Sequence, residues 1–148
     1  MIVTYSVPFV HGKERPRFSG HTYTPRETSA NEKRILNAYE GASIRRYGRV
    51  VKAPQHVPVT VALTCTVPAP RSRPKWCPRR LWDALNGVPF VKTPDLDNVL
   101  KEHMDALNHH AWFDDAQVTE THAWKLPRRR GGEERASVLV FWDERSEA

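Results

Sequence analysis

The chain has 148 residues, 39% of them hydrophobic and five of them tryptophan, which is enough for one compact domain and too little for two. Lys and Arg number 23 against 17 Asp and Glu, and the formal net charge of +6 favours polyanionic partners. No apolar run approaches the roughly 20 residues that a membrane-spanning helix needs, and the first residues lack the features of a signal peptide. We therefore expect a single cytoplasmic domain over residues 1–148, without a membrane partner.

The first third of the chain predicts one strand and one long helix. Residues 2–7 are rich in β-branched side chains and end at Pro8, as a short strand does. After a basic, turn-rich stretch, Thr24-Pro25-Arg26-Glu27 has the pattern of a capping box with proline at the first helical position. The helix should run to Tyr47 and stop at Gly48. It should bury the apolar residues at helical spacing, which are Ile35, Leu36, Tyr39 and Ile44.

Residues 57–67 alternate valine, leucine and cysteine with smaller or polar side chains, which is the strongest strand pattern in the chain. This strand should lie inside a sheet with one face on the helices. Cys65 within it and Cys77 beyond it have neither CxxC spacing nor the density of a secreted scaffold, so we expect reduced thiols.

The remainder of the chain alternates loops with short elements. Residues 68–78 read as an exposed basic loop, and residues 79–86 as a short helix that ends at Gly87. Two further strands are predicted at residues 117–126 and 136–142, joined by a basic hairpin turn at residues 127–132. Together these elements predict an α/β (α+β) fold, with a mixed β-sheet packed against two main helices.

Charge is divided unevenly along the chain. Residues 1–94 hold 16 Lys and Arg against 5 Asp and Glu, whereas residues 95–148 hold 7 against 12. A nucleic-acid enzyme that binds phosphates with one region and divalent cations with another needs such a division. Solvated surface charge explains the same asymmetry equally well.

The acidic residues cluster in one helix-turn-strand segment. Asp95 stands at a predicted helix entrance, and Asp97 and Lys101, four residues apart, share one face of that helix. Asp114 and Asp115 stand at the start of the next predicted strand. If helix and strand pack together, Asp115 can meet Asp95 and Asp97 in an all-oxygen site for magnesium or manganese, with Lys101 beside it to neutralise a phosphate.

Each part of this segment also has a purely structural explanation. Aspartates cap helices, a pair four residues apart is a common surface ion pair, and Asp-Asp is a common turn element. His109 and His110 could be read as further metal ligands, but in a polar turn beside a site for a hard cation we expect them to be exposed loop residues. The combination of the aspartates in one unit favours the metal site.

Three stretches together resemble the RusA family of Holliday junction resolvases. They are Pro94-Asp95-x-Asp97-Asn98-x-x-Lys101, then Asp105-Ala106-Leu107-Asn108, then Asp114-Asp115-x-Gln117-Val118. The resemblance is close over residues 93–125, extends to the basic stretch at residues 13–25, and is general in character over residues 53–91. The family often has glycine after the Asp-Ala-Leu-Asn stretch, where this chain has His109.

The resemblance implies a RusA-like domain and an activity. Asp95, Asp97 and Asp115 would be the metal-binding carboxylates and Lys101 the essential lysine, while Asp114 matches an adjacent family aspartate. The enzyme would be a magnesium-dependent homodimer, with Mn²⁺ as a possible substitute, that cuts branched four-way DNA by paired symmetrical nicks in recombination and repair. DNA contacts are expected from Lys13, Arg15, Arg17, Arg73 and Lys75, because basic segments follow the phosphate backbone.

Two other functions are compatible with the same residues. One is a non-catalytic DNA-binding module whose acidic cluster is structural, and the other is a general metal-dependent nuclease that acts on flaps or single strands. The presence of all three carboxylates together with Lys101 argues against a degenerate site. A panel of branched and linear substrates would separate the two nucleases.

Overall fold

The computed structural model describes residues 1–13, 17–18, 22–23 and 26–147. Four strands form one mixed sheet in the order β1-β8-β4-β6. β8 is antiparallel to both β1 and β4, whereas β4 is parallel to β6. The strands are β1 (Ile2–Val7), β4 (Val59–Thr66), β6 (Val118–Lys125) and β8 (Arg135–Phe141). The predicted strand at residues 57–67 is confirmed as β4, an inner strand whose core-facing side chains Val59, Val61, Leu63 and Cys65 are fully buried.

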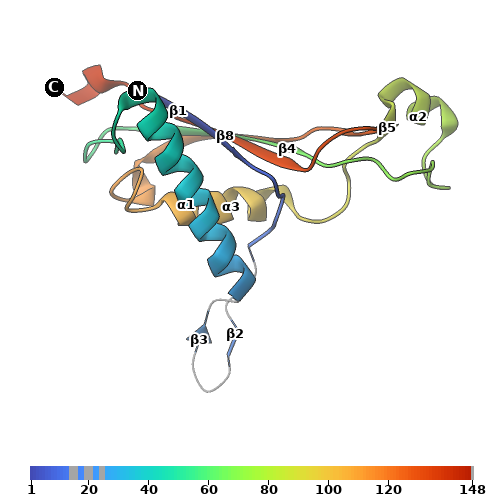
Figure 1. The fold of residues 1–148 in the computed structure, drawn as a ribbon, viewed down its shortest axis with the longest axis horizontal. Coiled ribbons are helices and arrows are strands. Elements are labelled where there is room, and N and C mark those ends of the chain that lie inside the picture. Colours follow the sequence, from blue (N-terminus) through green and yellow to red (C-terminus); the bar gives the residue numbers. More distant parts are fainter. Residues whose placement is uncertain (14–16, 19–21, 24–25, 148) are drawn as a thin grey trace.

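Two helices cover one face of this sheet, α1 (Arg26–Tyr47) and α3 (Leu96–Leu107) (Figure 1). The predicted mixed fold with two main helices is confirmed. So is the end of the first helix, because Gly48 has a φ of 75° that suits glycine. The predicted capping threonine, Thr24, lies outside the described residues. Ile44 was expected in the core, but this prediction is wrong: its side chain is 52% exposed, and Ala42 and Ser43 face inward instead.

The predicted hairpin between the last two strands is wrong. β4 lies between β6 and β8 in the sheet, so the connection at residues 126–134 crosses the end of β4. Part of that connection forms β7 (Arg128–Arg129), which pairs with β5 (Gly87–Val88). Alternation identified both strands correctly, but it carries no information about which strand pairs with which.

A small second cluster stands apart from the main core. Cys77, Trp82 and Val88 are buried together, with Ala69 packed against them. The short helix α2 (Arg79–Leu85) belongs to this part, which extends beyond the layers of sheet and helices in Figure 1. α2 ends at Asn86 in the left-handed conformation, with a φ of 52°, rather than at the predicted glycine.

The remaining elements are short. They are β2 (Arg17–Phe18), β3 (Thr22–Tyr23) and two 3₁₀ turns, η1 (Asp115–Gln117) and η2 (Glu144–Glu147). Both cysteines are free thiols in buried positions, as expected, and burial raises the pKa of the Cys65 thiol to about 11. In the described ranges, no helix is both long and apolar enough to cross a membrane.

Candidate active site

The first turn of α3 presents two exposed carboxylates. Asp95 occupies the N-cap position, with φ −67° and ψ 140°, but its side chain makes no capping hydrogen bond. Asp97 accepts only a local hydrogen bond, from the backbone N–H of Asn98 to Oδ1 over 3.0 Å. Lys101 is exposed one turn further along, and in the described structure it is not within ion-pair distance of Asp97. Capping therefore does not account for Asp95, and both carboxylates keep lone pairs available for a ligand.

Asp115 begins η1, beyond the other end of α3. Its Oδ1 accepts a hydrogen bond of 2.9 Å from the indole Nε1 of Trp112, a fully buried side chain. This contact fixes the carboxylate while leaving its other oxygen unconstrained by the indole. Trp112 was not predicted as a site residue, because a tryptophan beside a turn is usually interpreted as part of the hydrophobic core.

Asp114 has a structural role. Its Oδ1 accepts a hydrogen bond of 3.0 Å from the backbone N–H of Ala116, and Gln117 Oε1 accepts from the backbone N–H of Asp114, which completes a capping box around η1. The structural explanation that was considered for Asp114 and Asp115, a common turn element, therefore holds for Asp114.

Gln117 connects the turn to the rest of the domain. Its Oε1 also accepts from the N–H of Phe113 over 2.8 Å, and its Nε2 donates to the carbonyls of Pro54 and Val57 over 2.8 and 3.1 Å. The side chain is 9% exposed, so these bonds replace water. Gln117 thus holds the turn that carries Asp115 against the segment leading into β4. The Asp-Asp-x-Gln spacing was the available signal for this role.

His109 stands where RusA-like sequences often have glycine, and its backbone conformation accounts for that preference. It has a φ of 69°, in the left-handed region that favours glycine, and its Nδ1 lies 2.7 Å from the carbonyl oxygen of Phe113, to which it donates. Histidine is among the non-glycine residues that tolerate this conformation. His109 and His110 are both exposed, as expected.

The two groups of aspartates lie at opposite ends of α3. The helix has 12 residues, which corresponds to about 18 Å at 1.5 Å per residue. Lys125, the last residue of β6, donates from Nζ to the carbonyl of Pro94 over 3.0 Å, so β6 ends beside Asp95, whereas Asp115 precedes its start. Figure 1 shows the loop after α3 at the far end of the helix from its first turn. Among the described residues, no three His, Cys, Asp or Glu side chains lie close enough to hold a metal ion. One chain therefore does not bring Asp95, Asp97 and Asp115 together.

A family model for the endodeoxyribonuclease RusA matches residues 8–139. The chain belongs to the RusA endodeoxyribonuclease family. The match spans all three α-helices, β4, β6 and β8 as far as Leu139. The family is one of Holliday junction resolvases that hydrolyse DNA. A comparison with curated proteins found no match.

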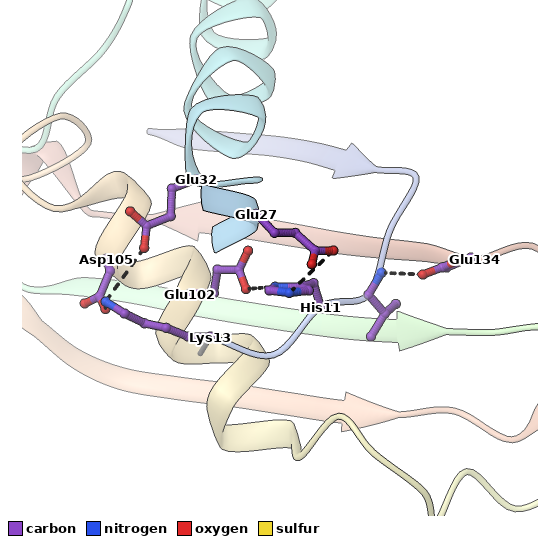
Figure 2. A network of polar contacts seen from close by, with 8 residues as sticks. His11, Lys13, Glu27, Glu32, Glu102, Asp105 and Glu134 are labelled. Atoms are coloured by element: carbon purple, nitrogen blue, oxygen red, sulfur yellow. Dashed lines mark hydrogen bonds and ion pairs between the residues drawn. The ribbon is translucent and has the colours of Figure 1, made fainter. Parts of the chain in front are cut away.

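The RusA-family chain folds its N-terminal segment onto α3 (Figure 2). The Lys13 ammonium contacts the carboxylate of Asp105, with Glu32 at 3.7 Å. The backbone N–H of Lys13 donates to the carbonyl of Asn98 over 3.2 Å. Burial opposes the charge of Lys13, but the hydrogen bond and charge of Asp105, with those of Glu32, outweigh it and raise the pKa of Lys13. Lys13 was predicted to bind DNA, and the structure gives it two carboxylate partners within the protein.

A second acid-base contact lies beside it on the same helix. His11 Nδ1 is 2.5 Å from Glu102 Oε2, and its Nε2 is 3.9 Å from Glu27. Glu102 is fully buried, and its Oε1 has no hydrogen-bond partner in the described structure. Burial raises the pKa of Glu102, and the contact with His11 offsets part of that rise. This network fixes the start of the basic N-terminal stretch against the helix that carries Asp95.

The other four residues predicted to contact DNA belong to the N-terminal basic stretch and to the loop before α2. Arg15 lies outside the described residues, and Arg17 is described only as backbone in β2. Arg73 and Lys75 are exposed on the loop before α2, where Arg73 Nη1 also donates to the carbonyl of Cys77 over 2.7 Å.

Proposed function

We propose that this protein is a magnesium-dependent endonuclease that resolves four-way DNA junctions in recombination and repair, making paired symmetrical nicks as a homodimer. The observation that supports this most directly is the state of the family's carboxylates. Asp95 and Asp97 are both exposed, Asp95 makes no capping hydrogen bond, and Asp115 is fixed by a buried indole. Manganese is the expected substitute for magnesium.

The donor set suits a hard cation. Asp95, Asp97 and Asp115 offer only carboxylate oxygens, which magnesium and manganese prefer over nitrogen or sulfur ligands. Such an ion, when bound, activates a water for attack on the phosphodiester and stabilises the charge that develops on the phosphate. Lys101 lies one turn from Asp97 and can place its ammonium against a non-bridging phosphate oxygen.

A homodimer can supply what one chain lacks. Asp115 is separated from Asp95 and Asp97 by the length of α3, so a three-carboxylate set requires a second chain. In a two-fold arrangement that brings the start of one α3 to the end of the other, Asp95 and Asp97 of one protomer would share a site with Asp115 of the partner subunit. Two such sites are equivalent by symmetry, as two equivalent strand cuts require.

The primary experiment is cleavage of a synthetic mobile four-way junction with and without magnesium. Asp97→Asn is expected to abolish cleavage while junction binding stays unchanged or becomes tighter, because one negative charge is removed near the DNA. Asp143→Asn is the matched control, since Asp143 is an aspartate paired with Arg145 far from α3 in sequence. Cleavage by Asp97→Asn at the rate of the control would place the active site elsewhere. Equal cleavage of linear duplex, flap and junction by the unmodified protein would overturn the resolvase assignment and leave a general nuclease.

Subunit mixing tests the shared site. Asp97→Asn and Asp115→Asn are each expected to be inactive, and a mixture of the two should regain nicking, because the mixed dimer contains one site with all three carboxylates. If each site formed within one chain, every site in the mixture would lack a carboxylate and no nicking would return. Nicked and doubly cut products separate on denaturing gels, and the mixed dimer should give single nicks.

A further inference from the structure

The part of the chain around α2 is the most basic region of the molecule. We define the basic arm as residues 68–92 and 127–132, which include α2, β5 and β7. It contains nine Lys and Arg against one Asp, a net charge of +8, whereas the remaining residues contain 14 Lys and Arg against 16 Asp and Glu. The basic arm thus carries more than the whole net charge of +6. Its exposed cations include Arg71, Arg73, Lys75, Arg79, Arg80, Arg129 and Arg130.

The two segments of the basic arm are fixed to each other. The N–H of Ala69 donates to the carbonyl of Arg129 over 3.0 Å, and the N–H of Arg130 donates to the carbonyl of Asn86 over 2.8 Å. Gly87 permits this contact, because a Cβ on it would lie 1.8 Å from the carbonyl oxygen of Arg128. The Arg130 guanidinium lies 5.5 Å from the ring centroid of the buried Trp82. The basic arm therefore joins cations from two distant stretches of sequence in one substructure that has its own small hydrophobic core.

Trp76 follows Lys75 in the basic arm and is 48% exposed. A single exposed apolar side chain is ordinary on a protein surface. Trp76 differs because Trp82 already fills the core of the arm, while the neighbouring Cys77 is fully buried and its carbonyl is bound by Arg73. The backbone beside Trp76 is thus anchored, and the exposed indole lies in sequence between Lys75 and the arginines of α2.

We propose that the basic arm is a contact surface for branched DNA, in which the cations bind phosphates and the Trp76 indole stacks on a base at the branch point. A continuous duplex keeps its bases stacked on one another, whereas a branch point can offer an unstacked base face to an aromatic side chain. The combination of cations and an exposed aromatic ring is the one that nucleic acids with accessible bases require. This inference rests on the proposed function, since it assigns branch recognition to a part of the chain outside the carboxylate site.

The basic arm is joined directly to the start of α3. Lys92, the last residue of its first segment, stands three positions before Asp95, and the Lys125 ammonium donates to the carbonyls of both Lys92 and Pro94, over 2.6 and 3.0 Å. The same ammonium lies 4.2 Å from the ring centroid of Phe90. DNA held by the arm would therefore have a defined position relative to the first turn of α3.

The test compares binding of a four-way junction with binding of linear duplex of the same length, in buffer without divalent cations so that neither is cut. Trp76→Ala is expected to weaken junction binding about tenfold or more, as loss of one base-stacking contact does, and to leave duplex binding unchanged. Trp76→Phe should retain part of the preference. Trp124→Ala is the matched control, since Trp124 is 49% exposed on β6, outside the arm, and should bind both DNAs as the unmodified protein does.

The cations of the arm have a different expected effect. Arg79→Gln with Arg80→Gln should weaken junction and duplex alike and lower the slope of log affinity against log salt by about one to two, because phosphate contacts carry no branch information. Lys33→Gln with Arg34→Gln, an exposed pair on α1, is the control that should change neither.

Each outcome separates this inference from the proposed function. Equal affinity of Trp76→Ala and unmodified protein for the junction, or an equal loss on junction and duplex, would overturn branch recognition by Trp76 even if the unmodified protein cuts junctions. If the unmodified protein binds junctions through Trp76 but does not cut them in magnesium, the inference holds and the proposed activity fails. If the double variant on α2 and the double variant on α1 weakened DNA binding equally, the role of the arm cations would be overturned.

Discussion

The indole Nε1 of Trp112 donates a hydrogen bond of 2.9 Å to Oδ1 of Asp115. Trp112 is fully buried in the loop after α3, so the orientation of the half-buried Asp115 carboxylate is set from inside the core. Outer partners that orient a metal-binding carboxylate commonly contribute 10- to 100-fold to metal affinity or activity. Trp112 is therefore expected to act on catalysis through Asp115, without contacting the substrate.

Trp112→Phe tests this role. Phenylalanine keeps the aromatic packing and removes the donor, so we expect junction cleavage to fall about tenfold and the magnesium concentration for half-maximal activity to rise. The smaller ring also leaves a cavity that costs roughly 1–3 kcal/mol of stability. Trp142→Phe, at a position 2% exposed near the C-terminus, should lose similar stability with no change in magnesium dependence. An identical magnesium response in both variants would leave Trp112 with a packing role only.

Gln117→Ala tests the connection between the turn and the body of the domain. Four hydrogen bonds are lost, two to backbone N–H groups and two to backbone carbonyls. Leaving these buried groups unpaired should reduce the free energy of unfolding by roughly 2–4 kcal/mol. Gln55→Ala, at an exposed position on the same segment, should change it by less than about 0.5 kcal/mol. Chemical denaturation of both variants measures the free energy of unfolding. Equal stability of the two variants would show that Gln117 does not hold the turn to the rest of the domain.

The sequence predicted the elements that repeat a burial pattern. β1, β4 and β8 alternate because one face is buried, and α1 ends where Gly48 takes a positive φ, so local chemistry was sufficient for them. Strand pairing was not predictable in the same way. The predicted hairpin fails because β4, distant in sequence, lies between β6 and β8.

The candidate site was predicted as a set of residues and not as an arrangement. The motif identified Asp95, Asp97, Lys101 and Asp115, but only the packing of α3 along β6 shows that the helix separates Asp115 from the others. Likewise, the composition of the N-terminal stretch could not show that Asp105 and Glu32 are partners of Lys13. Trp112, which acts through another side chain, has no sequence pattern of its own, and Gln117 has only the Asp-Asp-x-Gln spacing.

Lys13→Met tests whether Lys13 stabilises the protein or binds DNA. Methionine keeps an aliphatic stem and removes the ammonium that Asp105 and Glu32 share, each about a quarter exposed. We expect a loss of roughly 1–3 kcal/mol of stability, because two partly buried carboxylates lose their cation. The salt slope of junction binding should stay unchanged, whereas Lys75→Met, at an exposed position, should lower it by about one with no loss of stability. Unchanged stability of Lys13→Met together with a lower salt slope of junction binding would assign Lys13 to the DNA interface.

His103 should make the stability of the protein depend on pH. Its ring is 2% exposed, and its Nδ1 lies 2.8 Å from the hydroxyl of Tyr5. Burial lowers the pKa of His103 from 6.5 to about 4, so the folded protein keeps the ring neutral where the unfolded chain takes up a proton. The stabilisation is therefore complete above about pH 6.5 and is lost as the pH falls towards 4. At pH 5 the loss from this group is about 2 kcal/mol.

His103→Gln isolates that contribution. Glutamine keeps a neutral hydrogen-bonding group near Tyr5 and does not titrate, so the variant is expected to be less stable than the unmodified protein at pH 7.5 because of imperfect packing. Between pH 7.5 and pH 5 the difference in free energy of unfolding between the two proteins should narrow by about 2 kcal/mol. The reason is that only the unmodified protein has to keep a buried histidine unprotonated at pH 5. Glu102 and Glu32, whose pKa values burial raises, titrate in both proteins and cancel in the difference. Denaturant unfolding of both proteins at the two pH values gives the difference directly, and a gap that stays constant would show that His103 titrates alike in the folded and unfolded states.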